Sequence, residues 1–451
     1  MYEKEEKELA KAKESLDHIQ VPTKKLDAAI LTGFQRAKTE TKENSIDTPK
    51  KAVRKIRRWL IPSLAAAILM LSLVSSIRVS TAFAHYVAEI PGMEKIVELI
   101  RFDKGLISAV ESDYLQEIGE TQEKKGLSVT VDSVIVDETG MVLFYTIEAN
   151  KKQSQFYVED FELTPADGTD LEIGSISSQY DFLDAEKLHK SFSSSAELFF
   201  LEELETKTFN LIMKVETDDH KETFDFVFSL EKPVKVKKTY ELEETISIGE
   251  QEIKVKNITV SPLRVAVHVE YAPDNSKKIF EFPDIRLVDE YGESWTKIAN
   301  GVSASQISEN EAIIYLQSNY FKEPEELFLV INKIQAVDKD EAYLIVDTEK
   351  EEILKQPKGT ALSNVEWEDE MLMITLDVSE EFNYFFLNEV RDADGQEFYE
   401  NLSYSLREEN GIQKMGISLP KTNEIPYKNP LRMELSYFPS WIEGDVKLRV
   451  K

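Results

Sequence analysis

The sequence predicts a mainly β fold: short helices at the N-terminal side, one membrane-spanning helix, and three tandem β units after it. Three observations predict this organisation. Residues 60–77 contain no charged residue over 18 positions. From Gly126 onward, apolar and polar residues alternate with a period of two, which is typical of strands with one buried face. A set of strand and turn patterns then recurs at intervals of 124 and 103 residues, the length of a whole domain.

The N-terminal segment, residues 1–58, is polar and carries two narrow apolar stripes at helical spacing, separated by Val21-Pro22. The stripes consist of Leu9, Ala12, Leu16 and Ile19, and of Leu26, Ala29, Ile30, Gly33, Phe34 and Ala37. Two short amphipathic helices cannot bury an adequate core alone. We expect that a partner protein receives them in a groove; the alternatives are that they pair with each other or lie on a membrane surface.

Residues 59–78 predict a transmembrane helix with a cytoplasmic N-terminus. At 1.5 Å per residue, the uncharged stretch spans roughly 27 Å, just enough for a bilayer core of about 30 Å. Residues 1–59 carry a net charge of +5, and residues 78–451 carry −35. Six Lys or Arg residues lie at 50–58, so the positive-inside rule fixes the orientation. A cleaved signal peptide has a much shorter preceding segment, and this favours a single-pass signal anchor in the cell membrane.

A short segment just after the span has the small-x-small form that signal peptidase recognises. It consists of Ala82, Phe83, Ala84 and His85. This pattern indicates either a cleavage region or a chance pair of alanines near the membrane surface.

Residues 79–125 predict a membrane-proximal helical collar. Helical apolar spacing covers residues 93–100 and 105–118, with Arg101-Phe102-Asp103-Lys104-Gly105 near the junction. Arg101 and Asp103 could form an ion pair. The favoured interpretation is a helix-turn-helix that packs under the first β unit.

Three β units follow, at residues 126–235, 236–349 and 350–451. Each begins with a predicted hairpin, starting at Gly126, Ile253 and Ala361. Each continues with a turn that contains Gly168, Gly292 or Gly395, and then with a late strand at residues 209–216, 327–335 or 431–438. About seven short strands per unit are typical of an immunoglobulin-like β-sandwich.

The sequence contains no pattern that predicts catalysis, a cofactor or a metal site. There are no cysteines, and the five histidines do not pair at ligand spacing. Asp392-Ala393-Asp394-Gly395 resembles half of a calcium loop, and a plain β-turn is the favoured interpretation. A net charge of −30 argues against nucleic acid as a partner. We therefore expect a protein that is not an enzyme.

Three segments together resemble a Gram-positive family. They are VPTKKLDAAILTGFQRAK, EIPGMEKIVELIRFDKG and LSVTVDSVIVDETGMVLFYTIE, combined with the basic stretch before a single span. The family is that of transmembrane anti-sigma-factor-like proteins, which regulate extracytoplasmic-function sigma factors and carry an external domain of unknown function. The resemblance covers residues 20–235, and it extends to the remainder only in architecture.

The resemblance implies that the cytoplasmic helices hold a sigma factor inactive. An external ligand or event would trigger cleavage by an external protease and then by a membrane-embedded one, which releases the sigma factor. The implied sigma-binding residues are Leu16, Ile19, Leu26, Ile30, Phe34 and Arg36, and the implied cleavage region is residues 82–85. Binding must be independent of zinc, because the chain lacks the cysteines that many such proteins use. The alternative is a membrane-anchored cell-surface binding protein with tandem β-sandwich domains and no sigma partner.

Overall fold

The computed structural model describes residues 93–451, apart from residues 179–187, 299–301, 360–361, 369, 379–381, 399–401, 410–411 and 420–426. The predicted cytoplasmic segment, the predicted span and residues 82–85 lie outside this part. Within the described residues, no helix has the length and apolar character needed to cross a membrane. The chain divides into two compact units, Met1–Arg78 and Val79–Lys451, and the account below concerns the second.

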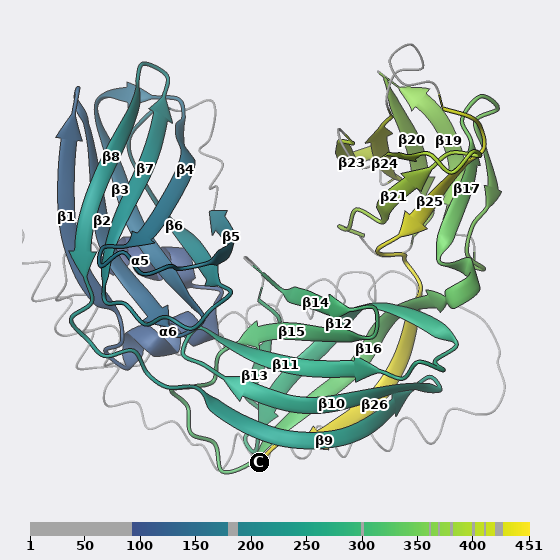
Figure 1. Cartoon of the computed structure of the whole chain (residues 1–451), viewed down its shortest axis with the longest axis horizontal. Helices are drawn as coiled ribbons and strands as arrows, with labels where there is room; N and C mark the ends of the chain where they lie inside the picture. Colours follow the sequence, from purple (N-terminus) through teal and green to yellow (C-terminus); the bar gives the residue numbers. More distant parts are fainter. Residues whose placement is uncertain are drawn as a thin grey trace, which may run out of the picture. The chain divides into compact units, whose positions relative to one another are not determined.

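The described chain is mainly β, as the sequence predicts, with six antiparallel sheets that enclose three apolar cores (Figure 1). In the part of the chain that the structure describes, two α-helices precede the strands, α5 at Met93–Ile100 and α6 at Lys104–Glu111. The second helix is shorter than predicted. It ends before Asp113, which adopts a left-handed φ of 55°, and residues 116–118 belong to the first strand.

Sandwich 1 contains the first eight strands. One sheet has the order β1-β2-β3-β6-β5, and the other has the order β4-β7-β8. The strand bounds are β1 Gln116–Lys124, β2 Leu127–Asp137, β3 Gly140–Gln153, β4 Phe156–Pro165, β5 Ile173–Ser178, β6 His189–Phe200, β7 Thr208–Thr217 and β8 Lys221–Ser229. The inward side chains of both sheets form a single core. The predicted hairpin is confirmed, since β2 and β3 are joined by a turn at Glu138 and Thr139.

Sandwich 2 also consists of two sheets around one core. Their orders are β14-β15-β11-β10-β9 and β13-β12-β16-β26. The strand bounds are β9 Lys238–Ile248, β10 Gln251–Val260, β11 Arg264–Tyr271, β12 Lys277–Asp289, β13 Ser294–Thr296, β14 Ala304–Ser308, β15 Glu311–Gln317, β16 Leu327–Asp338 and β26 Trp441–Arg449. Its predicted hairpin is formed by β10 and β11.

Sandwich 3 follows a short 3-10 helix, η1, at Lys339–Glu341. Its sheets have the orders β18-β17-β25-β21-β22 and β19-β20-β24-β23, and they share one core. The strand bounds are β17 Tyr343–Asp347, β18 Glu352–Lys355, β19 Leu362–Glu368, β20 Met371–Leu376, β21 Leu387–Arg391, β22 Glu397–Phe398, β23 Tyr404–Glu409, β24 Ile412–Ser418 and β25 Leu431–Leu435. Its predicted hairpin is formed by β19 and β20.

Sandwiches 2 and 3 exchange one strand each. In sandwich 1, β8 directly follows β7 and pairs with it. The corresponding place beside β16 is taken by β26, which comes from the C-terminus of the chain after sandwich 3 is complete. The corresponding place beside β25 is taken by β17, which precedes the other strands of sandwich 3. The units therefore do not follow the consecutive ranges 236–349 and 350–451 that the sequence suggests.

Strand length gives a physical reason for this exchange. β16 has 12 residues and pairs with β26, which has nine, whereas β17 and β25 have five each. The exchanged arrangement therefore pairs the two long strands with each other and the two short strands with each other, which leaves few backbone groups unpaired. Each crossing segment is hydrogen-bonded to the strand beside it, since Ala336 N of β16 donates to Ser440 O (3.1 Å) and Leu435 N of β25 donates to Ala342 O (3.0 Å).

The predicted turns recur in the three sandwiches with nearly the same backbone geometry. Gly168, Gly292 and Gly395 adopt φ values of 80°, 84° and 84°, a left-handed conformation that favours glycine. The segment that resembles half of a calcium loop forms such a turn, because Asp392 Oδ1 accepts from the backbone N–H groups of Asp394 and Gln396, both at 2.9 Å.

Candidate functional site: the collar joint

The collar helices contact both sandwich 1 and sandwich 2. Asp103 caps the N-terminus of α6, since its Oδ1 accepts from Leu106 N at 2.9 Å. Lys104 Nζ donates to Ser294 O of sandwich 2 (2.9 Å), and Gln317 Nε2 donates to Phe102 O (3.1 Å). Arg101, directly after α5, pairs with Glu98 of that helix and not with Asp103, so the ion pair considered from the sequence does not form.

An apolar cluster holds the collar in place. It combines side chains from both helices with the outer face of sandwich 1 and with one residue of sandwich 2. Its buried members are Met93, Ile96, Ile100, Ala109, Val110, Tyr114, Leu115, Ile135, Val142, Phe144 and Leu263. The favoured interpretation from the sequence, a collar packed against the first β unit, is confirmed, and the contact with the second unit is an addition to it.

Tyr114 links the end of the collar to the segment between sandwiches 1 and 2. Its hydroxyl donates to Val136 O (2.7 Å) and accepts from Lys235 N (3.0 Å), and its ring lies 5.2 Å from the ring of Phe321, centroid to centroid. Burial raises the pKa of Tyr114 to about 12, so its hydroxyl remains neutral at physiological pH.

A buried arginine lies at the centre of the joint. The side chain of Arg264, at the start of β11, is only 2% exposed, and its Nη2 donates to Glu197 Oε1 of sandwich 1 at 2.8 Å. The guanidinium carbon lies 4.8 Å from the ring centroid of Phe199 and 5.7 Å from that of Tyr315. Within the described residues, its Nε and Nη1 atoms have no hydrogen-bond partner. The two rings also contact each other, with centroids 5.5 Å apart, and this aromatic pair therefore provides much of the environment of the charge.

Glu197 and Asp103 feel the charge of this one arginine, and a third carboxyl group, Asp137, binds the backbone of the residue before it. Asp137, fully buried, accepts from Leu263 N through Oδ2 at 2.8 Å and thereby joins sandwich 1 to sandwich 2. Burial raises the pKa of Glu197, and the Arg264 guanidinium offsets this rise only in part. Burial also raises the pKa of Asp103. In this arrangement, which we call the collar joint, two carboxyl groups are harder to ionise than they are in water, because burial outweighs the positive charge that faces them.

The collar joint is closely packed at Gly105 in α6. A Cβ atom at this position would lie 2.6 Å from Ser318 N and 3.0 Å from Ser318 Cβ. Ser318 is itself held, since its hydroxyl donates to Ser261 O at 2.5 Å. Backbone therefore approaches backbone here at a distance that only glycine permits.

We expect Gly105→Ala to destabilise the protein, although alanine is the better helix former by about 1 kcal/mol. Overpacking against a fixed backbone costs about 1–3 kcal/mol and outweighs this gain. Thermal unfolding of the full chain measures the change. A raised unfolding temperature would mean that α6 and sandwich 2 are not packed as described.

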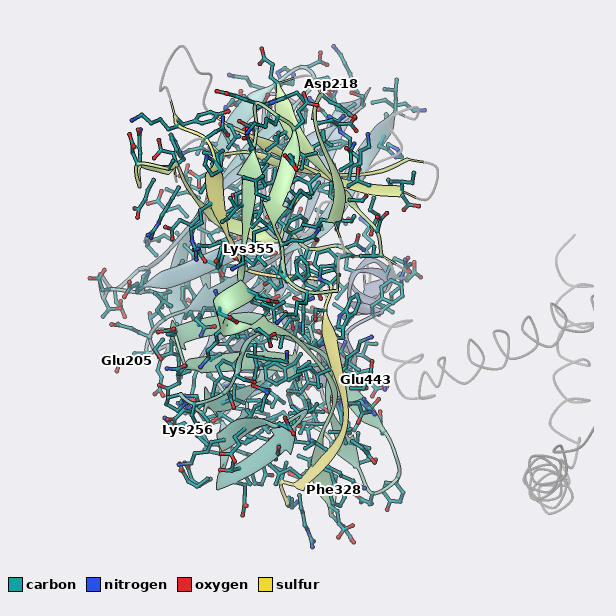
Figure 2. The ribbon with its side chains drawn as sticks, turned by 90° about the vertical axis from the view of Figure 1, so that its right-hand side faces the viewer. Glu205, Asp218, Lys256, Phe328, Lys355 and Glu443 are labelled. Atoms are coloured by element: carbon teal, nitrogen blue, oxygen red, sulfur yellow. The ribbon has the colours of Figure 1, made fainter. Side chains whose placement is uncertain are left out.

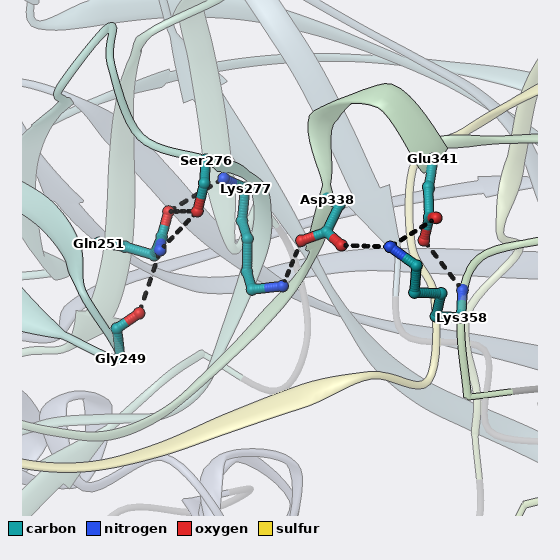
Figure 3. Close-up of polar contacts among 7 residues, drawn as sticks. All are labelled: Gly249, Gln251, Ser276, Lys277, Asp338, Glu341 and Lys358. Carbon is teal, nitrogen blue, oxygen red and sulfur yellow. Dashed lines mark hydrogen bonds and ion pairs between the residues drawn. The ribbon is translucent and has the colours of Figure 1, made fainter.

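A second polar network joins sandwiches 2 and 3 where η1 connects them (Figure 3). Lys277 Nζ lies 2.5 Å from Asp338 Oδ1, and Lys358 Nζ lies 3.5 Å from Asp338 Oδ2 and 3.0 Å from Glu341 Oε1. Gln251 extends the network, since its Oε1 accepts from Lys277 N at 3.0 Å. The hydrogen bond from the Lys277 ammonium group lowers the pKa of Asp338. The backbone N–H of Lys358, which donates to Glu341 Oε2 at 3.0 Å, and then the Lys358 ammonium group lower the pKa of Glu341.

The residues that the sequence singled out lie elsewhere. The predicted sigma-binding residues Leu16, Ile19, Leu26, Ile30, Phe34 and Arg36, and the predicted cleavage region from Ala82 to His85, lie outside the described residues. The sequence reasoning missed Arg264. A signal was available, because a single arginine stands among the apolar residues of Leu263-Arg264-Val265-Ala266-Val267. In the described part of the chain, no group of His, Asp or Glu side chains is arranged to hold a metal ion.

Two segments of the chain match families of unknown function. Residues 54–149 match a domain of unknown function (DUF4179), and residues 237–366 match a family of unknown function (DUF5643). No curated protein matches the chain. Among solved structures, the chain is similar to the crystal structure of the conserved domain protein from Bacillus anthracis, with 13% identity and a TM-score of 0.34. That similarity covers 53% of this chain and 84% of the other chain.

Proposed function

We propose that the protein is a membrane-bound anti-sigma factor. It holds an extracytoplasmic-function sigma factor at the cytoplasmic face and releases it on an external signal through proteolysis. The observation that carries this proposal is the change of charge across residues 60–77, from +5 before the segment to −35 after it. A basic amphipathic segment inside and an acidic β region outside are the two parts that such a regulator needs.

The collar joint supports the proposal. α5 is the first described helix after the predicted span, and it is packed against sandwich 1. Through Lys104 and Gln317, the residues after α5 are also bonded to sandwich 2. A ligand or force that shifts either sandwich would therefore act on the collar through direct contacts, without an intervening flexible linker.

We further infer that the external units are immunoglobulin-like. The orders β2-β3-β6-β5 and β4-β7-β8 in sandwich 1 correspond to A-B-E-D and C-F-G of that sandwich. Sandwiches 2 and 3 have the same arrangement once the exchanged strands β26 and β17 take the G position. Immunoglobulin-like folds serve many binding functions, so the fold is compatible with a sensor and does not identify its ligand.

Phe34→Asp is the test of the sigma-binding role. The full chain would be co-expressed with the sigma factor encoded nearest its gene and purified through a tag. We expect wild-type chain to retain the sigma factor and Phe34→Asp to lose it, because a carboxylate in an apolar groove is strongly unfavourable. Gln35→Asp is the matched control, since it adds the same charge on the predicted polar face and should leave binding intact.

Two outcomes would contradict the proposal. One is the absence of a complex with that or any other sigma factor of the same cell. The other is equal binding by wild type and Phe34→Asp. Either result would favour the alternative, in which the span only anchors a cell-surface binding protein, and deletion of residues 1–45 would then leave transcription unchanged.

A further inference from the structure

A cavity of about 230 Å³ lies between α5 and the outer face of sandwich 1, beside β1 and β2. Apolar side chains, among them Met93 and Ile96 of α5, form part of its lining. The remainder is polar and comes from Lys95, Glu117, Asp132, Ser133 and Thr146. The cavity is separate from the buried arginine of the collar joint and contains none of its carboxylates.

Two β-bulges meet at this cavity. Between β2 and β3 the register passes from Val131↔Tyr145 to Ser133↔Phe144, so Asp132 has no partner in the ladder. Between β1 and β2 the register passes from Glu117↔Ser133 to Glu120↔Val131. As a result, Asp132 and Ser133 follow one another on the outer face of the sheet. Bulges of this kind redirect side chains and are frequent next to binding sites.

Ser133 carries a buried hydroxyl without a partner. The residue is 1% exposed, and within the described chain its Oγ forms no hydrogen bond. A buried hydroxyl that is left unpaired destabilises the folded protein, and native structures contain few of them. Its place in the cavity wall points to a polar group of a ligand as the partner.

The carboxylates of the cavity are also short of positive charge. Thr146 Oγ1 donates to Asp132 Oδ2 at 2.8 Å. Within the described residues, neither Asp132 nor Glu117 forms an ion pair, and Glu117 is exposed whereas Asp132 is partly buried. Burial raises the pKa of Asp132, and the hydrogen bond from Thr146 together with the positive charge of Lys95 offsets this rise only in part. Two carboxyl groups and one ammonium group leave the cavity with an unbalanced negative charge.

We propose that this cavity binds a small primary amine that carries a short apolar group. The ammonium group would lie between Asp132 and Glu117 and donate to the Ser133 hydroxyl, and the apolar group would pack against Met93 and Ile96. Such a ligand supplies a second compact cation with several N–H donors, which would balance the second carboxyl group of the lining. It also matches the amphipathic lining and the small volume.

Binding would tie α5 to the bulged strands of sandwich 1. α5 begins eight residues after His85, the last residue of the predicted cleavage region. Under the proposed function, a ligand at this place would act on the described helix that is nearest in sequence to that region. This consequence rests on the proposed function, whereas binding itself does not.

The test uses isothermal titration of the full chain in detergent with isoamylamine, and with isocaproate as a ligand of similar apolar body and opposite charge. We expect saturable one-to-one binding of the amine and none of the acid. Asp132→Asn should weaken amine binding by roughly ten- to a hundredfold, the factor that a hydrogen bond to a charged group is worth. Glu120→Gln, on the exposed part of β1 and outside the cavity lining, is the matched control and should bind as wild type.

Ser133→Ala separates a ligand-binding role of this hydroxyl from a structural one. We expect its unfolding temperature to equal or exceed that of wild type, since an unpaired buried hydroxyl is removed, and its affinity for isoamylamine to fall. A lowered unfolding temperature with unchanged affinity would overturn the proposal, as would binding of isocaproate equal to that of the amine, or no binding of the amine. None of these measurements involves a sigma factor, so their failure is distinct from failure of the proposed function.

Discussion

Deletion of residues 440–451 is expected to unfold sandwich 2, which lies more than a hundred residues earlier in the chain. The deletion removes β26 and leaves the full edge of β16 unpaired. It also removes Ile442, Val446, Leu448 and Val450 from the core of sandwich 2. Since each backbone hydrogen bond contributes about 1 kcal/mol, the lost ladder alone costs on the order of 5 kcal/mol, a large part of the stability of one domain.

Limited proteolysis of the full-length and truncated chains measures this effect. We expect new cleavage sites within sandwich 2, while β7 and β8 of sandwich 1 stay protected. A synthetic peptide of residues 440–451 should restore protection by strand addition, and a peptide with the same composition in scrambled order serves as its control. Protection of sandwich 2 in the truncated chain without the peptide would contradict the exchanged arrangement. Phe328 on β16 and Glu443 on β26, both labelled in Figure 2, mark two positions of the ladder to examine.

Arg264→Leu is expected to destabilise the collar joint by about 3 kcal/mol, the lower end of the range for a fully buried pair, because Glu197 loses its opposite charge while its side chain is only 20% exposed. Arg286→Leu is the control, since its partner Asp284 is 38% exposed and such pairs contribute at most about 1 kcal/mol. Urea unfolding of the two variants beside wild type measures both changes. Equal effects of the two substitutions would contradict a special role for the buried pair.

The loss of folding stability in Arg264→Leu should depend on pH. A carboxyl whose pKa is raised by folding contributes stability that is fully present below its unfolded pKa, 4.5 for Glu197, and that is lost as the pH rises through the raised value. Removal of Arg264 raises the pKa of Glu197 further, so the variant recovers part of its stability as the pH falls from 7 toward 5. The double variant Arg264→Leu/Glu197→Leu should recover stability at both pH values, because an apolar pair replaces the buried charges.

Local features of the fold were predictable from the sequence because they depend on residues close together in the chain. The alternation around Val129 and Leu143 predicts a hairpin, and Gly168, Gly292 and Gly395 predict the turns that they form. The exchange of β17 and β26 was not predictable in this way. Alternation shows which side chains face a core but not which strand lies beside which, and neighbours in sequence are the ordinary expectation.

The candidate site was predictable only in part, for a related reason. The segment from Arg101 to Gly105 stood out, but its partners Ser294, Gln317 and Ser318 lie about 190–215 residues further along the chain. Asp103 before an apolar helical stretch was readable as an N-cap. The cavity beside α5 depends on β-bulges, and these arise from the register of three strands, which no single strand encodes.

The exchange of strands also affects how the chain is made. β16 ends at Asp338 and its partner β26 begins at Trp441. Sandwich 2 therefore cannot complete its fold until the residues of sandwich 3 have been synthesised. At about 5–20 residues per second, roughly 100 residues take on the order of 5–20 seconds. Throughout that interval the edge of β16 is open to pairing with another strand, including one from a neighbouring nascent copy. The risk of aggregation through the edge of β16 therefore ends only when β26 has been synthesised and has paired with it.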